Sequence, residues 1–398
     1  MSSASARIEF RISDAELERR WQAVRHAMVE RQLDAIIMQN QNDWLGGYVK
    51  WFTDLPATNG YPVSVAFYAS GTMSVVDMGP FEGRRVFDQP DDMRRGVELL
   101  LTTPAFTSIN VTSAYHAQAL VGDLQRRGAR KIGFLGAGAL PHGLVAALHD
   151  GLPNATFEEA SDWLDEIKAI KSPEEQGWIR RVANLQDQAF AAVLKGIKPG
   201  LRDHDIAALA WNEGQRLGSE QGITLGSSAR LGQRAGFLGR HQQGRRIEEG
   251  DHFSLLIEVN GPCGYYCELA RTIVLGRASA ELLEGFAAMQ EAQAHTLSLL
   301  KPGVLAADVA ASHDAWMVTH GLPPERRLYA HGQGADMVER PLIRADETMR
   351  LQANMNLAVH PGYETERLFA VICDNYMVEE AGPSACLHVT QKQVFELL

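Results

Sequence analysis

At 398 residues, the chain is longer than the roughly 250–300 residues that one hydrophobic core usually serves, so we expect two domains. Hydrophobic residues make up 45%, charged residues 22%, and the net charge is −11, which is typical of a globular protein and excludes a basic surface for nucleic acid. No stretch approaches the ~18 uninterrupted apolar residues of a membrane span, so we also exclude an integral membrane protein.

The amino-terminal sequence and the cysteines both favour the cytoplasm. Residues 1–21 lack an apolar core behind a basic head, so we expect no signal peptide and predict a soluble, cytoplasmic protein. Four cysteines do not make a disulfide framework in a chain of this length. Cys263 and Cys267 form a CxxxC pair, for which two small half-buried residues are a commoner explanation than a redox or zinc pair.

The first 165 residues alternate between helical and strand patterns. Apolar residues recur at helical spacing over residues 13–33, and a short apolar run at 35–38 is typical of a strand. Further strands are predicted at 62–68, 73–78 and 131–134, and further helices at 93–101 and 114–127. The sequence therefore predicts a small α/β domain over residues 1–165.

A helix start marks the boundary to a second domain, which we place at residues 166–398. Ser172 can cap a helix, Pro173 suits its first position, and Glu175 completes a capping box. A long helix with one apolar face should follow and end at Lys198-Pro-Gly200.

That helix end occurs twice in the chain. Residues 197–208 read IKPGLRDHDIAA and residues 300–311 read LKPGVLAADVAA, with the two prolines 103 residues apart (302 − 199). Each copy leads into a pair of strands, predicted within 253–276 and within 355–378. We therefore predict an α+β domain with an internal pseudo-two-fold repeat, and a site at the junction of its halves.

Several motifs follow one another in an order that resembles the creatinase, prolidase and aminopeptidase P superfamily. They are KSPEE at 171–175, the two KPG turns, GDHFSLLIEVNGPCGYYCELARTIVLG at 250–276, HGQG at 331–334 and VHPGY at 359–363. The resemblance implies an α/β amino-terminal domain followed by a pita-bread domain, and it covers nearly the whole chain.

The resemblance also implies where metal ligands would lie. Metal-dependent members of the superfamily hold two ions with two Asp, one His and two Glu, and these positions become Glu258, Glu268, His331, His360 and Cys373 here. Only His331 is unchanged, and a longer Glu moves its oxygens by about one C–C bond. We therefore expect neither the dinuclear centre nor any other cofactor. Ala335 replaces a second histidine of the family, which argues against peptide-bond chemistry.

Our leading hypothesis is a creatinase-like, metal-independent hydrolase that cleaves a C–N bond of a small, polar, nitrogen-containing molecule. His241 stands where the resemblance places the general base, and imidazole has a suitable reference pKa. Glu258 and Glu268 would hold the cationic or amide part of the substrate. His331 and His360 would donate hydrogen bonds to developing negative charge.

Other residues are candidates for substrate contact. An aromatic cluster of Trp44, Tyr48, Trp51, Phe52 and Tyr61 could form a stacking wall, although core and dimer packing is the commoner explanation for such a cluster. We include Tyr48, Trp51 and Tyr61 in the predicted site. Arg340 could bind a carboxylate, and Cys373 could contact the substrate or simply fill space. The resemblance implies a homodimer, and we expect no nucleic acid or membrane partner.

Two alternatives stay open. Glu258, Glu268, His331, His360 and Cys373 form a mixed N/O/S set that would suit one zinc or iron ion in a hydrolase or a lyase. The chain could also be a non-catalytic binding module, although a cluster of ionisable residues argues against that. The sequence does not identify the substrate.

Overall fold

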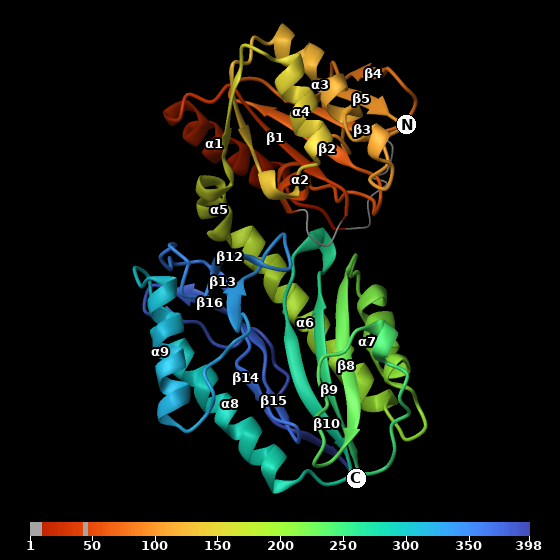
Figure 1. Cartoon of the computed structure of the whole chain (residues 1–398), viewed down its shortest axis with the longest axis vertical. Coiled ribbons are helices and arrows are strands. Elements are labelled where there is room, and N and C mark those ends of the chain that lie inside the picture. Colours follow the sequence, from red (N-terminus) through yellow and green to blue (C-terminus); the bar gives the residue numbers. More distant parts are fainter. Residues whose placement is uncertain (1–9, 43–46) are drawn as a thin grey trace. The chain divides into compact units, whose positions relative to one another are not determined.

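The computed structural model describes residues 10–42 and 47–398, so Trp44 lies outside the described residues. The chain divides into two compact units, Met1–Lys168 and Ala169–Leu398, which are described separately below (Figure 1). The boundary predicted after residue 165 falls within α5, Ser161–Ala169. In the described ranges, no helix is both long enough and apolar enough to cross a membrane.

The first unit is the expected α/β domain. Its seven-stranded mixed sheet has the order β4-β5-β3-β2-β1-β6-β7, with β1 antiparallel to β2 and parallel to β6. Buried residues of α3 and α4 pack against one face of this sheet. The strands are β1 Ala35–Asn40, β2 Val63–Tyr68, β3 Met73–Met78, β4 Gly83–Val86, β5 Val97–Thr103, β6 Lys131–Phe134 and β7 Thr156–Glu159. The other helices are α1 Asp14–Glu30, α2 Gly47–Thr53, α3 Tyr115–Arg126 and α4 His142–Gly151.

The helix predicted over residues 93–101 is wrong. This segment contains the start of β5, which runs parallel to β3 inside the sheet. Gly96 has a φ of 69°, which ends any helix before the strand begins. Val97 and Leu99 are buried whereas Glu98 is not, so burial follows the two-residue period of a strand.

The second unit begins with the predicted helix start. In α6, Pro173–Gly196, Ser172 and Glu175 form the capping box, which confirms the prediction. Helices α6 and α7 cover one face of a four-stranded sheet of order β18-β10-β9-β8. These elements are α7 Asp203–Arg216, β8 Gly222–Arg230, β9 Asp251–Val259, β10 Leu269–Leu275 and β18 Phe395–Leu397.

The second half of this unit follows the same plan with shorter strands. Helices α8 and α9 precede a five-stranded sheet of order β12-β11-β13-β16-β17, and β14 and β15 form a separate hairpin. Figure 1 shows α8 and α9 beside this half and α7 beside the other. The elements are α8 Ala280–Leu299, α9 Ala306–Thr319, β11 Ala330–Gly332, β12 Glu339–Leu342, β13 Asn356–Val359, β14 Gly362–Glu364, β15 Phe369–Val371, β16 Asp374–Glu379 and β17 Gly382–Pro383.

The internal repeat is present in the backbone. Helix α9 begins and ends 103 residues after α7 (306 − 203 and 319 − 216). Gly200 and Gly303 both take a left-handed φ, 92° and 88°, and the N–H of each donates a 2.8 Å hydrogen bond, to Ile247 and Leu351 respectively. The two halves therefore repeat the same turn and helix, as the sequence predicted.

Candidate functional site

Four of the predicted site residues converge where the two halves meet. On the first hairpin, Ile257 pairs with Leu269 and Asn260 pairs with Tyr266. Both pairs belong to the same antiparallel register, which places Glu258 directly opposite Glu268. In the other half, β11 carries His331 and pairs with β13, which is followed by His360. A bridge between Ala270 and Cys373 joins the two sheets beside these residues.

Glu268 lies at the centre of a compact cluster with the two histidines. Its Oε2 atom is 3.6 Å from Nε2 of His331 and 3.9 Å from Nε2 of His360. The imidazole rings meet edge to face, with centroids 5.2 Å apart and an angle of 71° between their planes. One ligand atom from each of the three residues lies within 4.8 Å of the others. Glu268 and His331 are buried, and the His360 side chain is 12% exposed.

Hydrogen bonds and burial determine which ring nitrogens of this cluster face Glu268. His331 donates its Nδ1–H to the carbonyl of Gly332 at 2.9 Å, so its other nitrogen, Nε2, is the one that faces Glu268, and in the neutral ring that nitrogen carries the lone pair. Burial lowers the pKa of His360 to about 4, so the ring is neutral at pH 7, and its buried Nε2 has no hydrogen-bond partner among the described residues. Burial would raise the pKa of Glu268, but positive charge at His360 and His331 lowers it to about 2, so this carboxylate favours a cationic neighbour.

A single metal cation fits this arrangement. Two imidazole Nε2 atoms and one ionised carboxylate form the His₂Glu set that several catalytic zinc sites use. His331 also has the Nδ1–H to carbonyl hydrogen bond that typically orients a metal-bound imidazole. Nε2 of His360 has no hydrogen-bond partner among the described residues, and a cation bound in the cluster would supply one.

Glu258 and Cys373 do not extend the cluster to a second ion. Oε1 of Glu258 accepts a hydrogen bond from the side-chain amide of Gln333 at 2.9 Å. Burial and the charge of Glu268 raise the pKa of Glu258 well above its usual value, so this carboxyl group is a much weaker acid than Glu268. Cys373 is fully buried, its thiol donates to the main-chain oxygen of Glu268 at 3.4 Å, and burial raises its pKa. Neither residue belongs to the described metal-binding group.

His241 is not brought to this cluster. It lies on the short helix Arg240–Gln242, where its side chain is exposed. The hydrogen bonds of its loop run to β8: the neighbouring Gln243 donates to the carbonyl of Gly226 at 3.2 Å. The structure shows no contact between His241 and any of the four converging residues.

The predicted substrate contacts are dispersed. The hydroxyl of Tyr48 donates to Asp165 at 2.8 Å, and Trp51 is only 2% exposed, so both serve packing within the first unit. The guanidinium of Arg340 is engaged by Glu347, with Nε 3.1 Å from Oε2. Tyr61, by contrast, is 40% exposed.

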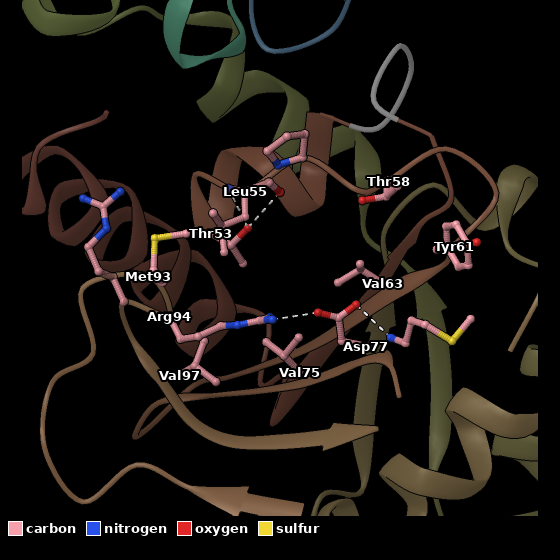
Figure 2. A pocket seen from close by; sticks show the side chains of 13 residues that line it. Thr53, Leu55, Thr58, Tyr61, Val63, Val75, Asp77, Met93, Arg94 and Val97 are labelled. Atoms are coloured by element: carbon pink, nitrogen blue, oxygen red, sulfur yellow. Dashed lines mark hydrogen bonds and ion pairs between the residues drawn. The ribbon is translucent and has the colours of Figure 1, made fainter. Parts of the chain in front are cut away.

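Tyr61 lines a cavity of about 520 Å³ in the first unit (Figure 2). Its walls are mostly apolar, and an ion pair between Arg94 and Asp77 at 2.7 Å crosses them. No residue of the Glu268 cluster lines this cavity, so its volume says nothing about the cluster's chemistry.

Two groups of residues near the cluster were not singled out from the sequence. Gln333 and Asn375 form a chain of side-chain amides that ends on Glu258. Lys171 and Glu339 form a buried ion pair at 2.6 Å beside Gly334. Glutamine and asparagine carry no charge signal, and the ion pair joins residues far apart in the chain, so no local pattern revealed either group.

Comparisons of the sequence and of the structure with known proteins indicate the same family. The profile of metallopeptidase family M24 matches residues 177–380. The Xaa-Pro dipeptidase of Pyrococcus horikoshii is 23% identical over 259 residues, which cover 64% of this chain and 73% of that protein. The ectoine hydrolase of Halomonas elongata is 24% identical over 245 residues, 58% of this chain and 61% of that protein. The crystal structure of an X-Pro aminopeptidase from Thermotoga maritima has a TM-score of 0.78 at 16% identity and covers 94% of this chain and 99% of its own.

These comparisons confirm the pita-bread fold and overturn the leading functional hypothesis. A metal-independent hydrolase of a non-peptide C–N bond does not agree with a metallopeptidase family and with relatives named Xaa-Pro dipeptidase. The hypothesis took the changed ligand positions as evidence against any metal. Three of those positions instead form the compact Glu and His cluster described above.

Proposed function

The chain belongs to metallopeptidase family M24, and from this membership we propose that it hydrolyses an amide bond of a small, peptide-like substrate with one metal ion. Glu268, His331 and His360 would hold the ion. The observation that carries the proposal is the meeting of one buried carboxylate oxygen and two imidazole Nε2 atoms, with one ligand atom from each residue within 4.8 Å of the others. The chemistry that a bound ion supplies there is polarisation of the carbonyl and activation of a water.

The protein's own residues divide the remaining work. Glu268 balances the charge of the ion, and the main-chain carbonyl of Gly332 orients His331. Glu258 lies directly opposite Glu268 and retains its proton because it is buried beside a negative charge. We assign Glu258 the delivery of that proton to the leaving nitrogen, which general acid catalysis requires when an amide bond breaks.

Dipeptides of the Xaa-Pro class are the first substrates to test, because two of the similar proteins are named for that activity. Such molecules are small and carry one scissile amide. The three ligand side chains together offer little exposed surface, which favours a small substrate over a protein chain.

The experiment is a turnover assay of zinc-loaded protein against Xaa-Pro dipeptides, amino-acid amides and ectoine. We expect hydrolysis of a dipeptide or amide that is lost after chelation and restored by added zinc. His360→Ala should abolish turnover, whereas His241→Ala, which alters an exposed histidine, should leave it within about twofold. Hydrolysis that survives complete metal removal, or that is confined to ectoine, would contradict the proposal.

The homodimer and the cytoplasmic location expected from the sequence stay predictions. The dimer is tested by light scattering on the purified chain, for which we expect about twice the subunit mass of 43.8 kDa. A mass equal to one subunit at micromolar concentration would contradict it.

A further inference from the structure

A chain of hydrogen bonds connects the two opposed glutamates through buried amides. The main-chain N–H of Glu268 donates to Oδ1 of Asn375 at 2.7 Å. Nδ2 of Asn375 donates to Oε1 of Gln333 at 2.8 Å, and Nε2 of Gln333 donates to Oε1 of Glu258 at 2.9 Å. Gln333 and Asn375 are both 0% exposed, so water does not compete for these bonds.

The first bond of this hydrogen-bond chain determines which group donates and which accepts in the bonds that follow. A main-chain N–H can only donate, so Asn375 must present its oxygen to Glu268 and its NH₂ group to Gln333. Gln333 must then accept with its oxygen and present its own NH₂ to Glu258. Asn356 adds a second constraint, since its Nδ2 donates to the main-chain carbonyl of Gln333 at 3.0 Å. Glu258 therefore accepts a hydrogen bond from the NH₂ group of Gln333.

We propose that Gln333 is a positioning residue that holds Glu258 away from the metal ion and keeps the ion's ligand set at Glu268, His331 and His360. This inference rests on the proposed function. Gln333 lies two residues after His331, so one segment supplies a metal ligand and the side chain that restrains Glu258. Without the donated hydrogen bond, the Glu258 carboxyl would be a buried acceptor facing a cation and would become an additional ligand.

Gln186 provides a matched control for loss of a buried amide. It is also 0% exposed, and its Nε2 donates to the main-chain carbonyls of Val259 and Cys267, the neighbours of the two glutamates. It does not contact the side chain of Glu258. Gln186→Met should therefore lower stability much as Gln333→Met does, without changing the ligands of the ion.

The test uses Co²⁺ as the probe, because its visible absorption bands report the number and type of ligands. In the full chain, Gln333→Met should shift these bands and tighten the Co²⁺ dissociation constant by about tenfold, because Glu258 would add a charged oxygen ligand to the ion. Glu258→Gln should keep the wild-type spectrum, and Gln333→Met with Glu258→Gln should restore it. Gln186→Met should also keep the wild-type spectrum.

Each other outcome has a defined meaning. A spectrum unchanged by Gln333→Met, in a variant with native circular dichroism, overturns the positioning role. A spectrum changed by Glu258→Gln alone shows that Glu258 is already a ligand and overturns it as well. A wild-type chain that binds no Co²⁺ or Zn²⁺ overturns the proposed function and this inference with it. Substrate assays are not needed for any of these results.

Discussion

Glu258 on β9 and Glu268 beside β10 lie opposite each other on antiparallel strands, and it is the Glu268 carboxylate that lies within 4 Å of the Nε2 atoms of His331 and His360. Burial and the charge of Glu268 raise the pKa of Glu258, whereas the two histidines lower the pKa of Glu268 against the effect of burial. Glu258 is therefore the weaker acid of the pair. This difference separates a metal ligand from a proton donor.

The first prediction concerns these two roles. Glu258→Gln keeps the size and the hydrogen-bonding capacity of the side chain but has no proton to give, so kcat should fall by about 10²–10⁴-fold with the zinc content unchanged. Steady-state kinetics and elemental analysis of the same preparation check this. Glu268→Gln is the control, because it should lose the ion as well as activity. Loss of zinc from Glu258→Gln would contradict the assignment.

The second prediction concerns the buried ion pair of Lys171 and Glu339. Their side chains are only 2% and 4% exposed, so removing one partner leaves the other charge buried without this ion pair. Lys171→Met should lower the free energy of unfolding by about 3–5 kcal/mol, and adding Glu339→Gln should recover part of that loss. Urea unfolding of the single and double variants measures the coupling. Additive losses would show that the two side chains do not depend on each other.

The third prediction is a pH dependence at Glu347. Burial would raise its pKa, but Arg340 and the main-chain N–H groups of Leu342 and Met349 lower it to about 2. Because the folded state favours the ionised form, the stabilisation is present above the unfolded pKa of about 4.3 and is lost as the pH falls toward 2.

Glu347→Gln should therefore reduce the free energy of unfolding by about 2 kcal/mol at pH 7, and this difference from wild type should shrink between pH 5 and about 2. Denaturant unfolding at several pH values measures it. A difference that stays constant across this range would show that ionisation of Glu347 does not matter.

The fourth prediction concerns the repeated turns. Gly200 and Gly303 have left-handed φ angles and open space where a Cβ would lie, so alanine at either position costs backbone strain alone. Each substitution should lower stability by a similar amount, about 1–2 kcal/mol. Gly177 lies within α6, also with open space, and Gly177→Ala should instead stabilise by about 0.5–1 kcal/mol. Thermal unfolding compares the three, and unequal effects at the two turns would argue against their equivalence.

Those parts of the fold that depend on nearby residues were predictable from the sequence. The capping box of Ser172 and Glu175 acts over one helical turn, and the KPG turns repeat with their left-handed glycines. The segment 93–101 was not predictable in this way. The spacing of its apolar residues is compatible with a helix or with a strand, and it forms a strand because it pairs with β3.

The site was predictable in its members but not in its internal organisation. The motif order placed Glu268, His331 and His360 together, while the exposed His241 shows that an equivalent position does not ensure an equivalent contact. The roles of Gln333 and Asn375 depend on the direction of hydrogen bonds between distant segments. Side-chain amides accept and donate equally well, so their sequence gives no indication of that direction.

The most direct test of the single-metal account is the number of zinc ions that the chain binds. The purified protein should be stripped with a chelator, titrated with Zn²⁺ by calorimetry and analysed for metal after dialysis. We predict one tightly bound ion per chain in the wild type and in Glu258→Gln, and none retained by His360→Ala. Two ions per chain, or no retained ion in the wild type, would contradict the account.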